Sequence, residues 1–155
     1  MDKKINIKRG YAAIGLDNPK SKENVGSVLR AAGCYGAKMV ASSGNRLRGC
    51  YKTDTQAAYR HMPYFHQIKN IFDVLPYDCV PVAVDLIDGA TPLHEYQHPE
   101  RAFYIFGGED NTLGARITDK CRDVIYIPTN YCMNLAATVN VVLYDRMTKR
   151  DIDQF

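Results

Sequence analysis

Short apolar runs rich in β-branched residues alternate along the chain with segments of helical periodicity. The runs are typical of buried strands and cover 11–16, 37–43, 80–86, 102–107 and 124–128. Helices are predicted at 23–36, in a region around 55–75 that Pro63 interrupts, more weakly near 112–122, and at 134–150. This alternation is typical of a mostly parallel sheet flanked by helices, and no repeat or linker divides the chain. We therefore predict an α/β fold in a single domain, residues 1–155.

The last predicted helix is apolar on nearly every side. In the segment NLAATVNVVLYDRM, residues 134–147, apolar side chains cover nearly all faces of the helix, and Thr138 and Asn140 are the exceptions between Leu135 and Tyr144. A helix of this kind is buried on more than one side. The core covers one side, and a second copy of the chain is the natural cover for the other. A central helix in a monomer is the alternative.

Composition restricts the class of protein. With 155 residues, 46% of them hydrophobic and 24% charged, the chain is long and apolar enough to bury one core, which argues against disorder. It has no run of about 18 apolar residues, the length that a membrane helix needs, so we expect a cytoplasmic protein. The five cysteines are scattered and form no CxxC pair, which argues against a disulfide framework and a structural zinc site.

Three predicted strands end in unusual loops. These loops are FGGED at 106–110, IPTNYCMN at 127–134 and AVDLIDG at 83–89. In open parallel sheets, ligands bind beyond the carboxyl ends of the strands. The paired glycines Gly107 and Gly108 leave the backbone bare, so that a ligand can approach it closely.

Several common cofactor and metal sites are absent from the sequence. DNPKSKEN follows the first strand in place of a GxGxxG loop, and neither GxxxxGK[ST] nor GxSxG occurs. His61 and His66 are five residues apart with Pro63 between them, which places them on different faces of any helix. His94 and His98 have helical spacing but lie in a loop-like stretch. We therefore expect no metal site.

The first predicted helix surrounds one cation with small residues. In ENVGSVLRAAGCYGA, residues 23–37, Arg30 faces away from the apolar side, and its neighbours there are Gly26, Ser27, Gly33 and Cys34. Small residues leave a trough beside this single cation. Alternatively, they permit close helix packing across a dimer interface, with Arg30 paired to an acid.

Three segments in order resemble the motifs of a known family. They are ENVGSVLRAAGCYGA at 23–37, YIFGGEDNTLG at 104–114 and IYIPTNYCMNLAATVNVVLYDR at 125–146. Together they resemble the SpoU (TrmH-like) class of SPOUT RNA methyltransferases. The size is most similar to its minimal members, the tRNA (cytidine/uridine-2′-O-)-methyltransferases. The resemblance covers essentially the whole chain.

The resemblance implies a specific fold and activity. The expected fold is a mostly parallel sheet flanked by helices, with a deep C-terminal trefoil knot, an exception to the rule against knots. The expected assembly is a homodimer packed through the first and last helices. The expected cofactor is S-adenosyl-L-methionine, and the expected reaction is methyl transfer to a ribose 2′-hydroxyl of RNA, with tRNA favoured. An rRNA 2′-O-methyltransferase and a catalytically inactive RNA-binding protein are the alternatives.

The resemblance also assigns residues. The catalytic positions are Arg30, Asn24, Glu109 and Asn134. The cofactor-binding positions are Val84, Gly107, Gly108, Ile127, Cys132, Met133 and Leu135. Because an arginine pKa above about 12 makes a poor general base, we expect Arg30 to orient the nucleotide and stabilise the developing alkoxide. Glu109 either orients the substrate pocket, or it caps a helix near Asn111 or accepts backbone N–H groups. Asn134 is expected at a helix N-terminus.

RNA contacts are expected from two basic segments, although the net charge is only +3. The candidate phosphate ligands are Lys8, Arg9, Arg46, Arg48 and Lys52, and the candidate base-stacking residues are Tyr51, Tyr59 and Tyr64. A solvated face and ordinary core tyrosines are the alternatives. Thr112 stands where the family has glycine and Cys132 where it has serine, and these two departures keep the inactive alternative open.

Overall fold

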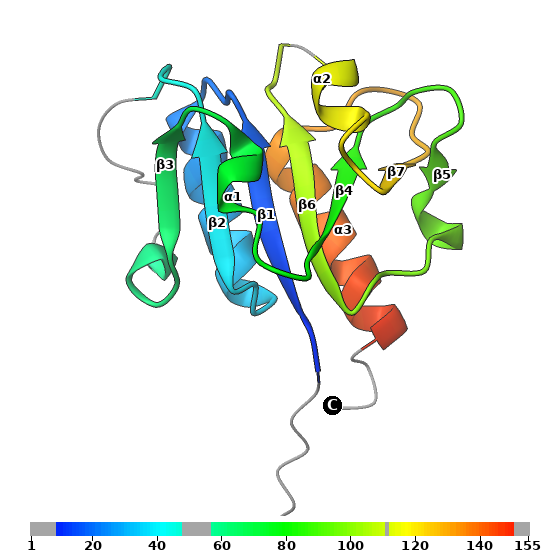
Figure 1. Cartoon of the computed structure of the whole chain (residues 1–155), viewed down its shortest axis with the longest axis horizontal. Coiled ribbons are helices and arrows are strands. Elements are labelled where there is room, and N and C mark those ends of the chain that lie inside the picture. The colour runs from blue at the N-terminus through cyan, green and yellow to red at the C-terminus, as the bar shows by residue number, and fades with distance from the viewer. Residues whose placement is uncertain (1–8, 48–56, 111, 151–155) are drawn as a thin grey trace, which may run out of the picture.

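The computed structural model describes residues 9–47, 57–110 and 112–150. In that part of the chain, seven strands form one sheet in the order β3-β2-β1-β6-β4-β7-β5, and every pair of neighbours is parallel (Figure 1). The strands are β1 Tyr11–Asp17, β2 Met39–Ser43, β3 Tyr64–Ile68, β4 Val80–Val84, β5 Thr91–Pro92, β6 Arg101–Gly107 and β7 Asp123–Tyr126. This sheet confirms the predicted α/β fold. The trefoil knot stays a prediction.

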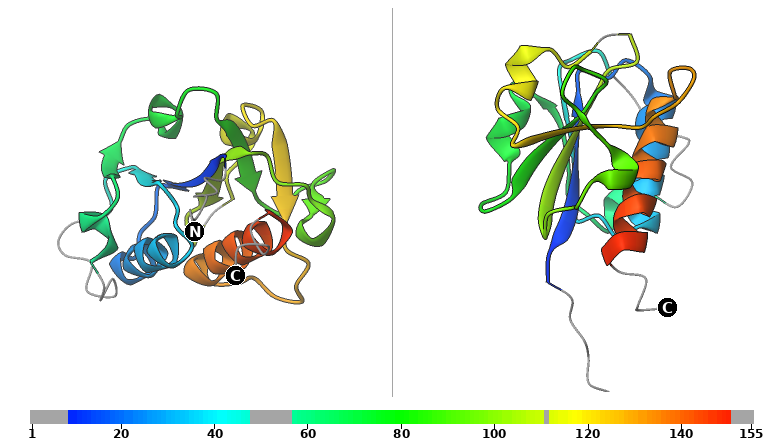
Figure 2. Two further views of the ribbon diagram at one scale, coloured as in Figure 1. Left: turned by 90° about the horizontal axis from the view of Figure 1, so that it is seen from below. Right: turned by 90° about the vertical axis from the view of Figure 1, so that its right-hand side faces the viewer.

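Helices cover both faces of the sheet. The α-helices are α1 Lys22–Cys34, α2 Ala115–Thr118 and α3 Leu135–Arg150, and the 3₁₀ turns are η1 Ala58–Arg60, η2 Ile71–Val74 and η3 Leu93–Glu95. Helices α1 and α3 lie side by side on one face, with η2 and α2 over the other (Figure 2). No helix among the described residues is long and apolar enough to cross a membrane.

Two apolar clusters lie on the two faces, because side chains alternate along each strand. On β6, Tyr104 and Phe106 point toward the cluster under α1 and α3, whereas Phe103 and Ile105 point toward η2 and α2. Both faces are therefore buried, which explains why the central strands read as continuous apolar runs.

In the region 55–75, which was predicted as a broken helix, the described residues 57–75 contain an edge strand between two 3₁₀ turns. Pro63 ends any helix there, and the aromatic pair Tyr64 and Phe65 favours an extended backbone beside β2. The helix predicted near 112–122 is also wrong in length: only Ala115–Thr118 is helical, after Gly114 with φ of 71°. The sequence analysis missed β5, which has only two residues.

Helix α3 begins one residue after its predicted start and is apolar on two sides. Leu135, Val139, Val142 and Leu143 are buried in the core. Tyr144, with 55% of its surface exposed, and the partly exposed Val141 lie outside it. In one chain this helix therefore has apolar side chains that the core does not cover.

A buried polar cluster joins the end of α3 to the start of β6, at the lower end of the sheet in Figure 1. His98 Nδ1 lies 2.6 Å from the Tyr104 hydroxyl, and His98 Nε2 lies 2.7 Å from Asp145 Oδ2. Arg146, only 6% exposed, donates to the Tyr104 hydroxyl at 3.1 Å and to the carbonyl oxygens of Pro99 and Glu100 at 2.7 Å each. Burial lowers the pKa of His98 to about 4, although Asp145 opposes this shift, so the ring is neutral at pH 7.

Candidate active site

In the described part of the chain all seven strands end at one edge of the sheet, the upper edge in Figure 1, because they are parallel. The segments that follow β1, β2, β4, β6 and β7 at this edge are 18–20, 44–47, 85–90, 108–114 and 127–134. They include the three loops that the sequence analysis selected. Strand β4 lies between β6 and β7, so that Val84 is in register with Phe106 on one side and Ile125 on the other.

Two hydrogen bonds connect three segments at this edge. Asn134 Nδ2 donates to Asn24 Oδ1 at 2.9 Å, and Asn24 Nδ2 donates to Glu109 Oε1 at 2.9 Å. The second carboxylate oxygen of Glu109 accepts from the backbone N–H of Lys20 at 3.1 Å. This site cluster of Asn24, Glu109 and Asn134 therefore joins the starts of α1 and α3 to the loop after β6.

Glu109 is held as a carboxylate. Partial burial raises its pKa, but the hydrogen bonds from Asn24 and from backbone N–H groups outweigh this effect, so the net pKa is lowered. The structure favours the interpretation that Glu109 accepts backbone N–H groups. It does not cap the next helix, because α2 begins at Ala115 with Gly114 in the capping position.

Asn134 has two structural tasks. Its Oδ1 accepts from the backbone N–H groups of Ala136 at 2.9 Å and Ala137 at 3.2 Å, which caps α3 as expected. Its Nδ2 makes the bond to Asn24. Ser21 plays the corresponding capping role for α1, because its Oγ accepts from the Asn24 N–H at 3.2 Å. Both helix starts are thus fixed where the site cluster forms.

Arg30 lies on the exposed side of α1, six residues beyond Asn24 and therefore about 9 Å farther along the helix axis. Its small neighbours differ in position: Gly33 and Cys34 are exposed, whereas Gly26 is buried in the core layer. Gly33 and Cys34 therefore lie on the same exposed side of the helix as Arg30.

The predicted cofactor residues come from three adjacent strand ends. Val84 ends β4, Gly107 ends β6 with Gly108 after it, and Ile127 follows β7. Val84 and Ile127 are half-buried and pack against the core, and Leu135 is buried in it. Met133 is half-buried and Cys132 is exposed. Asp85 Oδ2 accepts from the Leu113 N–H at 3.1 Å, which ties the loop after β4 to the loop after β6.

These strand ends suit an adenosine-type ligand. Apolar side chains at two of the strand ends offer contact area for a flat ring, and bare backbone at Gly107 and Gly108 offers N–H and C=O groups. Leu86 is 74% exposed in the adjoining loop and adds apolar surface.

A second polar cluster at this edge was not predicted. Arg46 donates through Nη1 and Nη2 to the two carboxylate oxygens of Asp110 at 2.9 and 3.1 Å, and Nη2 also donates to the carbonyl oxygen of Asn18. Lys20 Nζ lies 3.8 Å from Asp110 Oδ2. The hydrogen bonds from Arg46 lower the pKa of Asp110 to about 2. No local pattern indicates this pairing, because Arg46 and Asp110 are 64 positions apart.

Buried Asp17 was also missed. It accepts from Ser43 Oγ at 3.0 Å and from Arg116 at 2.7 Å, so it links β1, β2 and α2. The only sequence signal is the acid that ends the first strand. A second missed feature is Tyr131, 88% exposed, whose carbonyl oxygen accepts from Thr129 Oγ1 at 2.7 Å.

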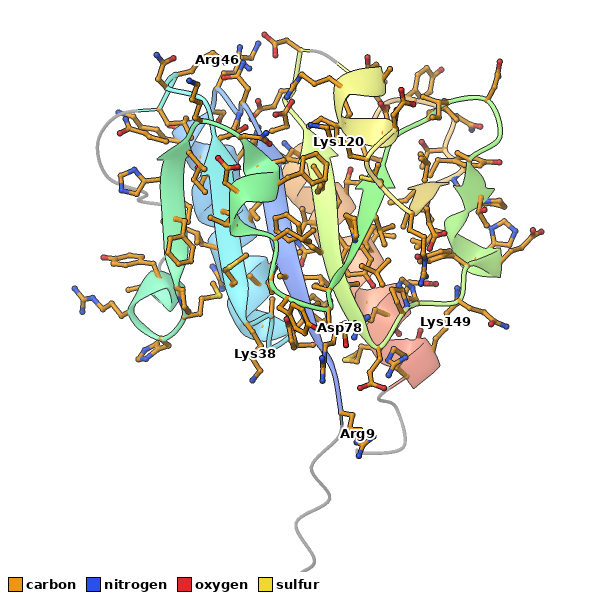
Figure 3. The ribbon with its side chains drawn as sticks, viewed as in Figure 1. Arg9, Lys38, Arg46, Asp78, Lys120 and Lys149 are labelled. Carbon is orange, nitrogen blue, oxygen red and sulfur yellow. The ribbon has the colours of Figure 1, made fainter. Side chains whose placement is uncertain are left out.

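The two predicted phosphate ligands that the structure describes lie at opposite ends of the sheet. Arg46 is at the upper edge, whereas Arg9 precedes β1 at the opposite end of the sheet (Figure 3). Lys8, Arg48, Lys52 and Tyr51 lie outside the described residues. Tyr64 packs against the core with its hydroxyl 3.1 Å from Ser42 Oγ, which favours a structural role, whereas Tyr59 is 44% exposed.

No metal site is found in the described part of the chain, since no group of three or more His, Cys, Asp or Glu side chains there can hold an ion. His98, one of the histidines considered from its spacing, is engaged in the buried cluster instead.

Comparison with known proteins identifies the family. The model of the SpoU rRNA Methylase family matches residues 11–144. No curated protein matches the chain.

Solved structures share the fold at low identity. The SpoU methyltransferase AviRb from Streptomyces viridochromogenes, in complex with AdoMet, superposes with a TM-score of 0.80 at 18% identity; the match covers 94% of this chain and 60% of that one. The TrmH/SpoU tRNA modifying enzyme of A. aeolicus gives 0.79 at 16%, covering 94% and 79%. A structure described as giving insights into the 2-OH methylation of C/U34 on tRNA gives 0.75 at 19%, covering 90% and 96%. This chain thus spans about three fifths of AviRb.

Proposed function

Because this chain belongs to the SpoU rRNA methylase family, we propose that it is an S-adenosylmethionine-dependent enzyme that methylates a ribose 2′-hydroxyl of RNA, with tRNA as its favoured substrate. One observation carries this proposal: the site cluster joins all three motif segments at the ligand-binding edge of the sheet through two bonds of 2.9 Å. The departures at Thr112 and Cys132 leave both bonds in place.

The cofactor would be held by the three strand ends. Val84 and Ile127 supply apolar contact, Gly107 and Gly108 supply backbone groups, and the segment 132–135 closes the site beside α3. S-adenosylmethionine supplies an electrophilic methyl group. The fit rests on the half-buried apolar side chains and bare backbone described above.

Positioning is the main task of the protein side chains in such a transfer, because the ribose oxygen must lie in line with the methyl group. The Asn134–Asn24–Glu109 chain holds the starts of α1 and α3 and the loop after β6 in place relative to one another. Arg30 would then bind the nucleotide through its planar fork and stabilise negative charge on the 2′-oxygen. The 2′-hydroxyl proton would pass to solvent water, the oxygen would take the methyl group, and S-adenosylhomocysteine would leave.

Two further parts of the proposal concern partners. The exposed Val141 and Tyr144 on α3, which packs beside α1, support a homodimer through these two helices. The match over 96% of a chain connected with methylation of C/U34 on tRNA supports tRNA, because both proteins are of similar size. A cytoplasmic location remains part of the proposal.

The test is a transfer assay. The purified protein is incubated with S-adenosylmethionine carrying a labelled methyl group and unmodified bulk tRNA, and the digested nucleosides are identified. We expect label in a 2′-O-methylated nucleoside and its loss in Arg30→Ala. If the protein binds the cofactor but does not methylate tRNA, ribosomal RNA becomes the proposed substrate. Absence of both would contradict the enzyme and favour an inactive RNA-binding protein.

A further inference from the structure

Arg46 is held from two independent directions. Its two terminal nitrogens donate to both oxygens of Asp110, at 2.9 and 3.1 Å. One of them also donates to the backbone carbonyl of Asn18. Since the Asn18 contact does not involve Asp110, it would still hold one terminal nitrogen of the guanidinium if the carboxylate moved away. The fork is therefore preorganised for an anion.

A second cation converges on the same anion. Lys20 Nζ lies 3.8 Å from Asp110 Oδ2, and it comes from the loop after β1, whereas Arg46 comes from the loop after β2. The side chains of Lys20 and Arg46 are 51% and 30% exposed, so a ligand can reach both. A phosphodiester presents two oxygens to an arginine fork in the same way as a carboxylate.

The place of this pair relates it to the site cluster. Asp110 directly follows Glu109, and the N–H of Lys20 donates to the Glu109 carboxylate at 3.1 Å. An RNA whose ribose lies against the site cluster carries a phosphate on either side of that ribose. A phosphate near Asp110 therefore fits the same bound strand.

We propose that Arg46 and Lys20 form a binding site for an RNA backbone phosphate next to the target ribose, and that Asp110 occupies this site until RNA displaces it. This inference rests on the proposed function, because it takes RNA as the ligand. Exchange is feasible since exposed ion pairs contribute little stability. RNA phosphates also release condensed counterions when a protein cation neutralises them.

Asp110→Asn tests the competition, because it keeps the shape of the side chain but removes its charge. Binding of an oligouridylate and of unmodified tRNA is measured over a series of NaCl concentrations, without S-adenosylmethionine. We expect binding about three- to tenfold tighter than wild type at low salt. The plot of log K against log salt should steepen by about 0.7, because no freed carboxylate takes up a cation.

Two controls separate a site from a general charge effect. Asp88→Asn removes an exposed acid from the loop after β4 and should improve binding much less. In an Arg46→Ala background, Asp110→Asn should give no more improvement than Asp88→Asn gives. An equal gain in Asp88→Asn, or a gain that persists without Arg46, would overturn the proposal.

This experiment fails independently of the proposed reaction. If the variants bind RNA as expected but no methyl transfer is detected, the phosphate site is supported and the proposed enzymatic function is contradicted. Methyl transfer with no effect of Asp110→Asn would do the reverse. The phosphate-site proposal would also be overturned if wild type and Asp110→Asn are both folded, as judged by circular dichroism, and neither binds the oligouridylate or the tRNA.

Discussion

Each end of the sheet carries a series of linked side-chain hydrogen bonds, but one series is open to solvent and the other is buried. At the upper edge, Asn134, Asn24 and Glu109 are linked in exposed or half-buried positions. At the lower end, the buried His98 and Tyr104 are linked with Asp145 at the edge of the core. In the lower cluster both ring nitrogens of His98 have partners, whereas the upper cluster remains open to solvent and ligands.

The difference assigns different tasks to similar chemistry. A buried polar network stabilises a fold only when each member is paired, and it is costly to break. An exposed network costs little to alter but can position a substrate. We therefore expect changes at the lower end to act on stability, and changes at the upper edge to act on methyl transfer.

The largest expected effect is on the stability of the lower cluster. Arg146→Met removes the donors to the Pro99 and Glu100 carbonyl oxygens and to the Tyr104 hydroxyl. Three hydrogen bonds from a charged donor are lost in a buried place. The Pro99 carbonyl oxygen loses its arginine donor, whereas the Glu100 carbonyl oxygen keeps the Tyr11 N–H and the Tyr104 hydroxyl keeps His98, so the free energy of unfolding should fall by about 3–5 kcal/mol. Urea unfolding measures this change, and transfer per folded molecule should stay near wild type.

A matched change in an exposed pair provides the control. Arg122→Met breaks the contact with Asp123, in which Arg122 is 56% exposed. Its cost should stay below about 1 kcal/mol. Equal costs for the two arginines would contradict the distinction between the ends of the sheet.

The next effect concerns the upper edge. Asn24→Ala removes the central member of the site cluster while keeping a good helix former in α1. Methyl transfer should fall about 10²- to 10³-fold, a loss typical for a removed positioning group. The melting temperature should change little, and Lys22→Ala in the same turn is the control. Transfer at the wild-type rate would show that the cluster has only a structural role.

The smallest effect is a pH dependence of stability. Since the pKa of His98 is lowered to about 4 in the folded protein, the unfolded chain binds a proton between pH 6.5 and 4 that the folded protein does not. The free energy of unfolding should therefore decrease as the pH falls, by about 2 kcal/mol between pH 7.5 and 5. Urea unfolding at both values tests this.

Here the exposed His94 supplies the comparison. His94→Gln should retain the full pH dependence in this window, whereas His98→Gln should lose most of it even though it is less stable throughout. A wild type with equal stability at pH 7.5 and 5 would show that His98 is protonated without cost.

Periodicity predicted the elements that are long or central. The strand at 11–16, the helix at 23–36 and the helix at 134–150 all appear with small shifts of their ends. The sequence pattern did not predict that β3 is a strand. At the edge of the sheet its exposed side chains interrupt the apolar pattern, and its extended backbone depends on pairing with β2, which is a tertiary contact.

The site was predictable only where a motif marks it. Asn24, Glu109 and Asn134 came from the family resemblance, and the structure places them together. The partner of Arg46 was not predictable, because neither residue of the pair shows a local signal and only the fold brings the two loops together.

The double role of Asn134 restricts which amino acid can occupy its position. Serine, threonine or aspartate can cap a helix, but none has an amide group that donates while its oxygen accepts two N–H groups. Glutamine has both groups on a longer stem that misplaces them. The architecture therefore restricts position 134 to asparagine, in natural sequence change as well as in protein engineering, independently of any requirement of the substrate.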